Sequence, residues 1–481
     1  MVPVIASDWE QFQKDEMNVG WTIDDAPISG PVLMWSYNTD GGGMSGIDTT
    51  PIVADGKVFV LTYQGYLYIF DAFSGQYINR TLCNDETTGG FELSTPAYHD
   101  GIVYVATSKG NESQGHGRVT AIYAEDGGGH LAGDIREQGD LGEGLEGFQL
   151  NTPVTYADGK IYVGNWKGGT THTEDNGTYY CLDASDVTSE VWNRTASYAT
   201  GYYWAGAAII DNYVIYGDDR ANVTCLNKDT GAFVDYINVS EEYGIDAREI
   251  RSSIVWNDGY DRIYFTSKGG YAFAIGFDAE TGYFNTTGNS DWNSPHDIGY
   301  TTSTPVVYDS RVCVSWGGFG ANGKIYCLDE SDGSEIWSTS NIGGIQGSPA
   351  VSVVDGHKYI YFTVNNANGS VYCLEDMGGI YEQRWEWNPP APDNQYIMQG
   401  MIISDGMVYF GTDYGTVYAL KERGICGDVN LDDVINPLDA MKVYNGDISS
   451  GEWAADVNCD GVVNPLDAMK IYNGDLNCCS G

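Results

Sequence analysis

Two short acidic segments in the last part of the chain carry residues whose types and spacing predict metal binding. Residues 428–439, DVNLDDVINPLD, and residues 456–467, DVNCDGVVNPLD, are two copies of one loop. In each copy, side chains with oxygen atoms stand at the first, third, fifth, ninth and twelfth positions, and the seventh offers its backbone carbonyl. Calcium takes about six to eight oxygen ligands, and this alternation directs them to one centre. The sequence therefore predicts one calcium ion in each loop.

The expected ligands follow directly from the loop positions. A single acidic turn in a chain this acidic could bind nothing, but each loop runs into a nearly identical segment, NPLDAMKVYNGD or NPLDAMKIYNGD, which predicts a short helix ended by Asn-Gly. This duplication favours calcium binding. The predicted ligands are Asp428, Asn430, Asp432, Asn436, Asp439 and the carbonyl of Val434 in the first loop, and Asp456, Asn458, Asp460, Asn464, Asp467 and the carbonyl of Val462 in the second.

The two predicted helices also repeat one set of apolar residues. Two equal helices related by a pseudo-twofold axis can present the same surface to a partner in two orientations. The alternative is that these residues close the small core that such a short domain needs. The candidate partner-binding residues are Pro437, Leu438, Met441 and Tyr444 in the first copy, and Pro465, Leu466, Met469 and Tyr472 in the second.

The rest of the chain is built from repeats that predict β-structure. Units such as TPIVADGKVFVLTYQGYLYIFDAFSG from residue 50 and NTPVTYADGKIYVGN from residue 151 occur eight times before residue 422, at a spacing typical of propeller blades. Each unit predicts three strands joined by tight turns containing Gly, and a more variable fourth strand follows. One four-stranded blade cannot bury both of its faces, so we expect eight blades of antiparallel strands arranged in a ring.

The last repeat lacks its fourth strand, because the repeat pattern ends at residue 421. The segment PVLMWSYNTD, residues 31–40, has the pattern to supply this strand and to close the ring without a free sheet edge. The predicted fold is therefore an all-β, eight-bladed β-propeller followed by a small α-helical domain. We expect an N-terminal segment over residues 1–30, the propeller over 31–421 and the calcium-binding domain over 422–481.

The repeat resembles a known family. The unit TPxxxDGxVYxxxxxGxxYxLDxxxG, with Trp192, Trp337 and Trp385 in fourth strands, resembles the pyrroloquinoline-quinone-type (PQQ-like) propeller repeat over residues 8–421. The opening DWEQFQKDEMNVGW is similar to the first segment of PQQ-like propellers in archaeal and bacterial surface proteins. This resemblance implies that fourth-strand tryptophans dock neighbouring blades. Three other residues stand where such a tryptophan would be expected, namely Asn79, Asp235 and Thr286.

The paired calcium loops, each with Asp at its last position and each followed by one helix, resemble the dockerin module over residues 426–477. That resemblance implies docking onto a cohesin domain of a scaffold or surface protein. The chain departs from the family in three features: Asp433 replaces a usual Gly, Pro-Leu occupies the tenth and eleventh positions, and Gly446 and Gly474 shorten the helices. Because those two positions and the helix face serve recognition in the family, the expected partner is a cohesin-like domain or a neighbouring copy of this chain.

The PQQ-like resemblance raises the question of catalysis. PQQ-dependent alcohol dehydrogenases of this type carry an adjacent Cys-Cys pair within the propeller, a calcium ion and a catalytic Asp. The adjacent pair here, Cys478-Cys479, lies beyond the propeller, so we predict no PQQ and no catalytic residues. A carbohydrate-active enzyme docked to a cohesin scaffold is an alternative, because propellers can present paired carboxylates. A quinoprotein dehydrogenase is a weaker alternative.

Composition restricts the partners and the location. The formal net charge of −44 disfavours nucleic acid and anionic lipid headgroups, and no apolar stretch is long enough to cross a membrane. We expect a secreted or cell-surface, non-catalytic binding unit, with a glycan as a further candidate ligand. Eight Asn-x-Ser/Thr sequons support an extracellular location: Asn79, Asn111, Asn176, Asn193, Asn222, Asn238, Asn285 and Asn368.

The ten cysteines fall into two groups. Four of them share one repeat position in the third strand, which predicts small core residues: Cys181, Cys225, Cys327 and Cys373. Cys313 lies on the second strand beside Cys327, so a cross-strand disulfide between these two is an alternative. A disulfide that joins the ends of the C-terminal domain is expected among Cys426, Cys459, Cys478 and Cys479.

Overall fold

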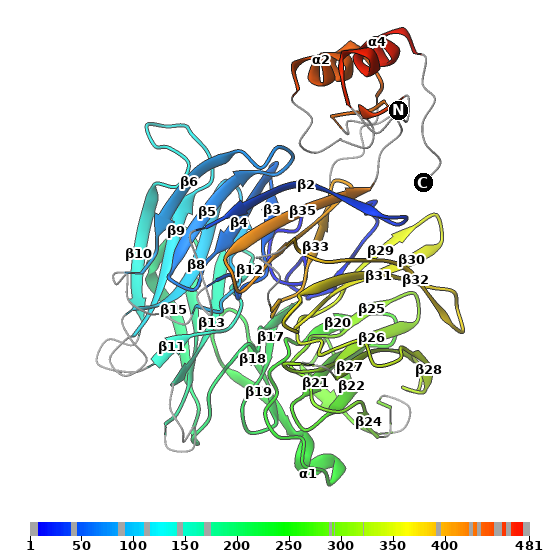
Figure 1. Cartoon of the computed structure of the whole chain (residues 1–481). Helices are drawn as coiled ribbons and strands as arrows, with labels where there is room; N and C mark the ends of the chain where they lie inside the picture. Colours follow the sequence, from blue (N-terminus) through cyan, green and yellow to red (C-terminus); the bar gives the residue numbers. More distant parts are fainter. Residues whose placement is uncertain are drawn as a thin grey trace.

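The computed structural model shows a ring of eight β-sheets followed by two short helices (Figure 1). It describes residues 8–39, 46–84, 92–109, 116–141, 148–167, 175–287, 291–292, 294–320, 322–390, 396–422, 427–430, 434–446, 455–457 and 463–474. The expected eight-bladed, four-stranded propeller is confirmed. None of the described helices is long and apolar enough to cross a membrane.

The first four blades follow the chain in order. Blade 1 has β3 (Ile52–Ala54), β4 (Lys57–Leu61), β5 (Tyr66–Asp71) and β6 (Tyr77–Leu82), and blade 2 has β7 (Ala97–His99), β8 (Ile102–Lys109), β9 (His116–Tyr123) and β10 (Ile135–Leu141). Blade 3 has β11 (Phe148–Leu150), β12 (Thr155–Ala157), β13 (Lys160–Lys167), β14 (Thr178–Asp183) and β15 (Asp186–Thr195). Blade 4 has β16 (Ala208–Ile210), β17 (Tyr213–Gly217), β18 (Asn222–Asn227) and β19 (Phe233–Asn238), followed by the short helix α1 (Val239–Tyr243).

The last four blades continue the ring. Blade 5 has β20 (Val255–Asn257), β21 (Arg262–Ser267), β22 (Tyr271–Asp278), β23 (Tyr283–Asn285) and β24 (His296–Asp297), and blade 6 has β25 (Val306–Tyr308), β26 (Arg311–Gly317), β27 (Gly323–Asp329) and β28 (Glu335–Ser338). Blade 7 has β29 (Ala350–Val354), β30 (His357–Val364), β31 (Ser370–Asp376) and β32 (Tyr381–Trp387), with β1 (Trp21–Thr22) added in parallel to β29. Blade 8 has β33 (Ile402–Ser404), β34 (Met407–Gly411), β35 (Thr416–Glu422) and β2 (Pro31–Asn38).

The two ends of the propeller sequence meet in blade 8. Strand β2 pairs antiparallel with β35, from Pro31 opposite Glu422 to Asn38 opposite Thr416 (Figure 1). Strand β2 therefore fills the fourth place that the eighth repeat leaves empty. The backbone N–H and C=O groups of β35 that face β2 are therefore hydrogen-bonded, so β35 is not an edge strand.

Tight turns between the first and second strands repeat one conformation. At Asp55 and Gly56 the backbone φ angles are 47° and 69°. These left-handed conformations match the type I′ hairpin turn, which Asp-Gly favours because Gly tolerates positive φ without steric cost. The Asp-Gly dipeptides of the repeats thus set the register of the strands that follow them.

Fourth-strand tryptophans connect four of the blades to the element beside them, as the family resemblance implies. The indole of Trp192 in blade 3 donates to the carbonyl of Lys228 in blade 4 at 2.8 Å, and Trp35 in blade 8 donates to the carbonyl of Ala72 in blade 1 at 2.8 Å. Trp337 donates to the Asp376 carboxylate at 3.0 Å, and Trp385 to the carbonyl of Pro27 at 2.7 Å. Each buried indole N–H therefore has its acceptor on an adjacent element.

Blade 5 corrects the expectation that Thr286 leaves this blade without a docking tryptophan. Trp292, beyond the end of β23, donates to the carbonyl of Glu330 in blade 6 at 3.0 Å and is buried. The ring lies against Gly333, where an added Cβ would come within 2.6 Å of the indole. The same contact recurs between Gly231 and Trp192. The docking tryptophan of blade 5 therefore lies after the end of its fourth strand and not within it.

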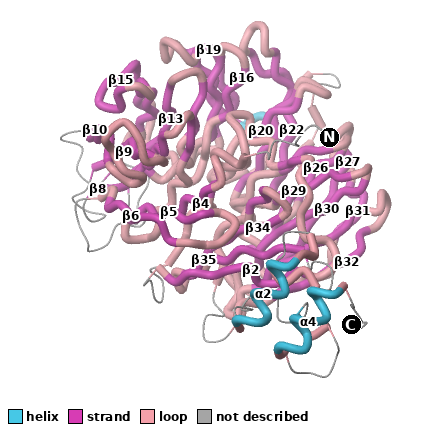
Figure 2. Tube along the Cα trace, turned by 90° about the horizontal axis from the view of Figure 1, so that it is seen from above, coloured by secondary structure: helices cyan, strands magenta, loops and turns pink. Residues whose placement is uncertain are grey.

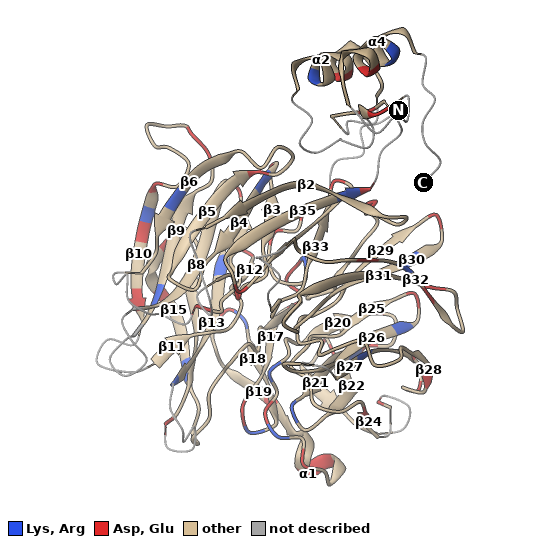
Figure 3. Ribbon diagram, in the orientation of Figure 1, with Lys and Arg blue, Asp and Glu red and all other residues tan. Residues whose placement is uncertain are grey.

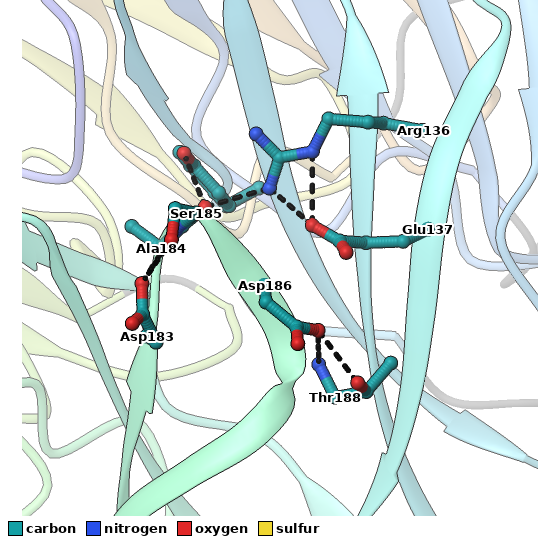
Figure 4. Close-up of polar contacts among 8 residues, drawn as sticks. Arg136, Glu137, Asp183, Ala184, Ser185, Asp186 and Thr188 are labelled. Atoms are coloured by element: carbon teal, nitrogen blue, oxygen red, sulfur yellow. Dashed lines mark hydrogen bonds and ion pairs between the residues drawn. The ribbon is translucent and has the colours of Figure 1, made fainter.

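Three blades make the connection with other residues. The Asn79 amide of blade 1 donates to the carbonyl of Ala132 at 2.6 Å, and the Arg136 guanidinium of blade 2 donates to the carbonyl of Ala184 in blade 3 at 2.6 Å (Figure 4). In blade 4 the direction is reversed, since the Asp235 carboxylate accepts from the backbone N–H of Phe284 at 2.9 Å. These three blades therefore make the connection with polar side chains in place of an indole.

The cysteines of the repeats are buried and free. Cys181 and Cys373 lie directly opposite Trp192 and Trp385, so the small side chain leaves room for the indole on the neighbouring strand. Cys313 and Cys327 are cross-strand partners in β26 and β27, but they form no disulfide. Cys426, Cys459, Cys478 and Cys479 lie outside the described residues.

Candidate functional site

The last two helices form a matched pair beside the propeller, where they pack against each other (Figure 2). Helix α2 spans Pro437–Asn445 and helix α4 spans Pro465–Asn473. Asn436 and Asn464 cap the two helices, and each has φ −151° and ψ 174°. Gly446 and Gly474 end them in the left-handed conformation. The local signals of both copies therefore produce the same geometry.

The side chain of the twelfth residue of each loop points into the C-terminal domain. The carboxylate of Asp439 accepts from the backbone N–H groups of Val429 at 2.8 Å, Asn430 at 3.1 Å and Asn436 at 2.8 Å. Asp467 accepts from the N–H of Asn464 at 3.0 Å. Both side chains are fully buried. The carboxylate thus holds the start of the loop against the first turn of the helix.

The ninth position does two tasks in the first copy. The Asn436 side-chain oxygen accepts from the N–H of Leu438 at 2.8 Å, and its amide donates to the carbonyl of Val434 at 3.0 Å. Asn464 accepts in the same way from the N–H of Leu466 at 2.8 Å. These asparagines therefore serve as helix caps, a role that the metal assignment alone does not include.

The structure describes part of the predicted calcium ligand set. Asp428, Asn430, Val434, Asn436 and Asp439 of the first loop are described, while Asp432 lies outside the described residues. In the second loop, Asp456, Asn464 and Asp467 are described, and Asn458, Asp460 and Val462 are not. Among the described residues, no three His, Cys, Asp or Glu side chains are grouped as a metal site.

The donor chemistry of the described residues fits a hard cation. Asp428 and Asp439 are both fully buried in one short loop, and burying carboxylates is costly unless they are paired or bind a metal. In the second copy, the Oδ1 atom of Asp467 is buried without a hydrogen-bond partner among the described residues. Calcium, which takes carboxylate and carbonyl oxygens, would give the Oδ1 atom of Asp467 a partner and would compensate the charge of the buried carboxylates.

The repeated apolar residues lie on the surface of the helix pair. Leu438 and Leu466 are 59% and 52% exposed, and Tyr444 and Tyr472 are 70% and 68% exposed. Pro437, Pro465, Met441 and Met469 are exposed as well. The core of the domain is made by other residues: Val429, Ala440, Val443, Ala455, Val457, Ala468 and Ile471.

The centre of the ring contains a cavity of only about 20 Å³. This volume holds about one water molecule. It is lined by residues of seven blades and the N-terminal segment, including Phe12, Thr95, Trp204, Thr304 and Met398. The described residues thus leave no space for a fused-ring cofactor at this point of the axis.

A cluster of charged residues near the axis was missed by the sequence interpretation. The guanidinium of Arg251 lies 3.2 Å from the Asp219 carboxylate and 4.4 Å from the ring centre of Tyr203. Asp48 and Asp413 share a hydrogen bond, and burial raises the pKa of Asp413 to about 6 and that of Asp48 well above its usual value. No local motif marks these residues, since they come from loops far apart in the chain.

The described sequons differ in their surroundings. Asn176, Asn193, Asn285 and Asn368 are exposed. The amide nitrogens of Asn79, Asn222 and Asn238 all donate to protein acceptors, and Asn222 is buried. Asn111 lies outside the described residues. In the view of Figure 3, basic residues are scattered along the ribbon among acidic ones.

Comparison with known proteins agrees with this architecture. The chain matches the family described as outer membrane protein assembly factor BamB over residues 29–129 and 84–339, which is more than half of its length. It also matches the dockerin type I domain over residues 426–474. The chain therefore belongs to the PQQ-type propeller family and carries a dockerin type I domain. No curated protein matches it significantly.

Solved structures share the fold at low identity. Quinohemoprotein alcohol dehydrogenase from Comamonas testosteroni has a TM-score of 0.63 at 14% identity, covering 86% of this chain and 80% of its own. Europium-containing methanol dehydrogenase has a TM-score of 0.63 at 11% identity, covering 86% of this chain and 98% of its own. BamB from Moraxella catarrhalis has a TM-score of 0.53 at 14% identity, covering 82% of this chain and 98% of its own.

Proposed function

We propose that this protein is a secreted, non-catalytic binding unit of the cell surface, attached or assembled through its calcium-loaded C-terminal domain. The domain boundaries we propose are residues 1–30, 31–421 and 422–481, with the last region holding two calcium ions. The partner of this domain is a cohesin-like domain or a neighbouring copy of the chain. The propeller supplies a rigid platform whose strands are paired around the ring.

The observation that carries this proposal is the equal exposure of two apolar helix faces. A small domain normally buries its leucines, because each buried Leu contributes about 1.5–3 kcal/mol. Here Leu438 and Leu466 stay exposed at matching positions while Ala440, Val443, Ala468 and Ile471 form the core. A repeated exposed apolar face is a feature of interaction surfaces.

We expect calcium to stabilise the two loops. When bound, it would be held by the loop carboxylates, amides and carbonyls, and it would neutralise their charge. Asp439 and Asp467 lie in the first turns of α2 and α4 and join each loop to its helix. The exposed faces begin two residues before these aspartates, at Pro437 and Pro465, so loss of calcium should disturb the partner surface directly.

The narrow axis supports a non-catalytic propeller. The cavity that the described residues form at the axis has a volume of about 20 Å³, which holds about one water molecule. The buried Asp48–Asp413 pair does not fit the alternative of a carbohydrate-active enzyme, because these two carboxyl groups share a hydrogen bond, whereas the paired carboxylates of glycoside hydrolases stand about 5–9.5 Å apart. Hydrolysis of neutral polysaccharides by wild type would establish that alternative.

The test uses the intact chain and compares calcium with a chelator. Size-exclusion chromatography with light scattering, alone and with a purified cohesin domain, should show a calcium-dependent complex. Leu438→Asp or Leu466→Asp alone should leave much of the affinity, whereas the double variant should remove it, because charge is then buried in either orientation. Ile380→Asp, at a propeller residue that is 67% exposed, is the matched control.

Each result has a clear meaning. Unchanged complex formation by the double variant would refute the proposed surface. A single substitution that unfolds the calcium-loaded domain would show that Leu438 or Leu466 supports the core instead, and circular dichroism of the same sample detects this. A monomer without any complex in calcium, with either partner, would refute the docking role.

A further inference from the structure

A cleft between blades 3 and 4 arises from one change in the repeat. Five blades have a tyrosine at one equivalent position near the end of the third strand. These residues are Tyr68, Tyr180, Tyr326, Tyr372 and Tyr418. In blade 4 the same position holds Thr224. Thr224 lies opposite Tyr216 on β17 and opposite Tyr236 on β19. The middle of this cross-strand row therefore lacks the ring that five other blades place there, while blades 2 and 5 have Thr120 and Ile275 at this position.

The missing ring leaves a cleft of about 480 Å³. This volume lies within the range of about 300–1,000 Å³ that is typical of ligand sites. In blade 1, the corresponding Tyr68 is buried and the guanidinium of Arg80 lies 5.8 Å from its ring centre. The cleft in blade 4 is lined by Arg194, Ala196, Ser197, Tyr198, Tyr202, Tyr216, Asn222, Thr224, Phe233, Tyr236, Asn238 and Glu241.

Aromatic rings form the walls and the floor of this cleft. Phe233 and Tyr236 are 49% and 56% exposed, and their ring centres are 6.2 Å apart. The guanidinium of Arg194 lies 5.7 Å from the ring centre of Phe233 and comes from β15 of the neighbouring blade. Tyr202 and Tyr216 are buried and meet edge to face at 5.2 Å. The cleft thus has fixed walls and an accessible apolar surface.

Polar side chains are held in fixed orientations along the same cleft. The Tyr198 hydroxyl donates to the Asp218 carboxylate at 2.6 Å, and the Asn222 amide donates to the same group at 3.1 Å. The Asn238 amide donates to the Asn222 side-chain oxygen at 2.9 Å. Arg194 and Glu241 are the charged lining residues, and their charges are opposite. The lining is therefore neutral overall, within a chain of net charge −44.

We propose that this cleft binds a short neutral saccharide. A sugar ring offers an apolar C–H face, which exposed Phe and Tyr rings can cover, and a rim of hydroxyl groups. Arginine, carboxylate and amide groups can pair with neighbouring hydroxyls, since together they provide donors and acceptors in fixed planes. An anionic saccharide is disfavoured, because the strongly acidic chain repels it. This inference does not depend on the docking role of the C-terminal domain.

Two sequons line the cleft, so a glycan of the chain itself is the competing occupant. Asn222 and Asn238 both use their amide nitrogen as a hydrogen-bond donor to protein groups in the folded chain. Attachment of a sugar at either nitrogen would replace one of these donated hydrogens. Protein produced in a host without N-glycosylation therefore presents the cleft open and separates the two cases.

The intact chain from such a host should be applied to an array of neutral oligosaccharides of glucose, mannose, xylose and N-acetylglucosamine. Anionic oligosaccharides and proline-rich peptides belong on the same array. Isothermal titration with the best oligosaccharide then compares four variants. Phe233→Ala and Tyr236→Ala should weaken binding at least about ten-fold. Thr224→Tyr, which introduces the residue of five other blades, should abolish it. Tyr283→Ala, at a residue that is also 56% exposed but outside the cleft, should bind like wild type.

Several outcomes would overturn this proposal. They are the absence of binding to any neutral oligosaccharide, binding to anionic sugars or peptides alone, and equal affinity of wild type, Phe233→Ala and Tyr236→Ala. Because Phe233 and Tyr236 are exposed, these two variants remain informative if Thr224→Tyr does not fold. Binding that persists in chelator would show that the cleft works without the calcium-loaded domain.

Discussion

The indole of Trp292 donates a hydrogen bond to the backbone carbonyl of Glu330 and joins blade 5 to blade 6 at 3.0 Å. The same backbone position of blade 4, Lys228, accepts from Trp192. Trp292 reaches this position from a connection beyond its strand, whereas Trp192 lies within β15. The acceptor carbonyl and the glycine beside it, Gly333 or Gly231, therefore define the blade connection better than the position of the tryptophan in the repeat.

This relationship predicts the effect of two substitutions in blade 5. Trp292→Ala should destabilise the propeller by about 3–5 kcal/mol, because it removes a buried ring and leaves a cavity. Thr286→Ala, at the position that the repeat assigns to the tryptophan, should change stability by less than about 0.5 kcal/mol. Chemical denaturation followed by tryptophan fluorescence measures both. Equal losses in the two variants would contradict the assignment.

Calcium removal should unfold the C-terminal domain and leave the propeller folded. Its carboxylates at Asp428, Asp439 and Asp467 are buried, and burial of their charges is costly without a bound cation. Limited proteolysis in a chelator should then cleave within residues 422–481 and spare the rest. Asp439→Ala combined with Asp467→Ala should give this pattern even in calcium. A domain that resists protease after confirmed metal loss would show that calcium is not required.

Ring closure should depend on the N-terminal segment. Deletion of residues 1–40 removes β2 and leaves one side of β35 unpaired, which favours association between sheet edges. It also removes Trp9, which is fully buried, and the carbonyl of Pro27 that accepts from Trp385. We expect aggregation and a lower melting temperature, measured by light scattering during heating. Deletion of residues 423–481, which keeps Glu422 of β35, is the control and should leave the ring monomeric. A soluble ring of wild-type stability without residues 1–40 would contradict this.

The Asp48–Asp413 pair should make stability depend on pH. Burial raises the pKa of Asp413 to about 6 in the folded chain, above the ordinary value of 3.8, so the folded state holds this proton more tightly. The stabilisation is present at low pH and is lost as pH rises from about 4 to about 6. Asp413→Asn should therefore stabilise the protein at pH 8, by on the order of 2 kcal/mol, relative to wild type.

Thermal unfolding between pH 4 and pH 8 measures this effect. Glu92, whose pKa burial raises to about 8, adds a dependence of the same sign in both proteins, so the difference between variant and wild type isolates the pair. Asp100→Asn removes one exposed charge and should leave the wild-type pH profile unchanged. A parallel profile for Asp413→Asn would show that the pair does not share a proton.

The sequence alone determined the repeating architecture and the duplicated loop–helix units of the C-terminal domain. Both follow from short stretches of sequence: Asp-Gly turns and alternating apolar residues predict the strands, and the Asn-Gly at residues 445–446 predicts the end of α2. These features depend on neighbours within a few residues, or on the register of adjacent strands, and such local constraints can be read from spacing.

Only the tertiary structure decided what lies between blades. Trp292 replaces the tryptophan expected at Thr286, and Arg136 takes a similar place in blade 2, because any donor that reaches the next carbonyl satisfies the contact. Thr224 is an ordinary strand residue in the sequence, yet the ring it lacks opens a cleft against blade 3. The Asp48–Asp413 pair joins loops at opposite ends of the propeller sequence, which meet only because the ring closes. Contacts of this kind depend on distances in space, which cannot be predicted from the spacing of residues in the sequence.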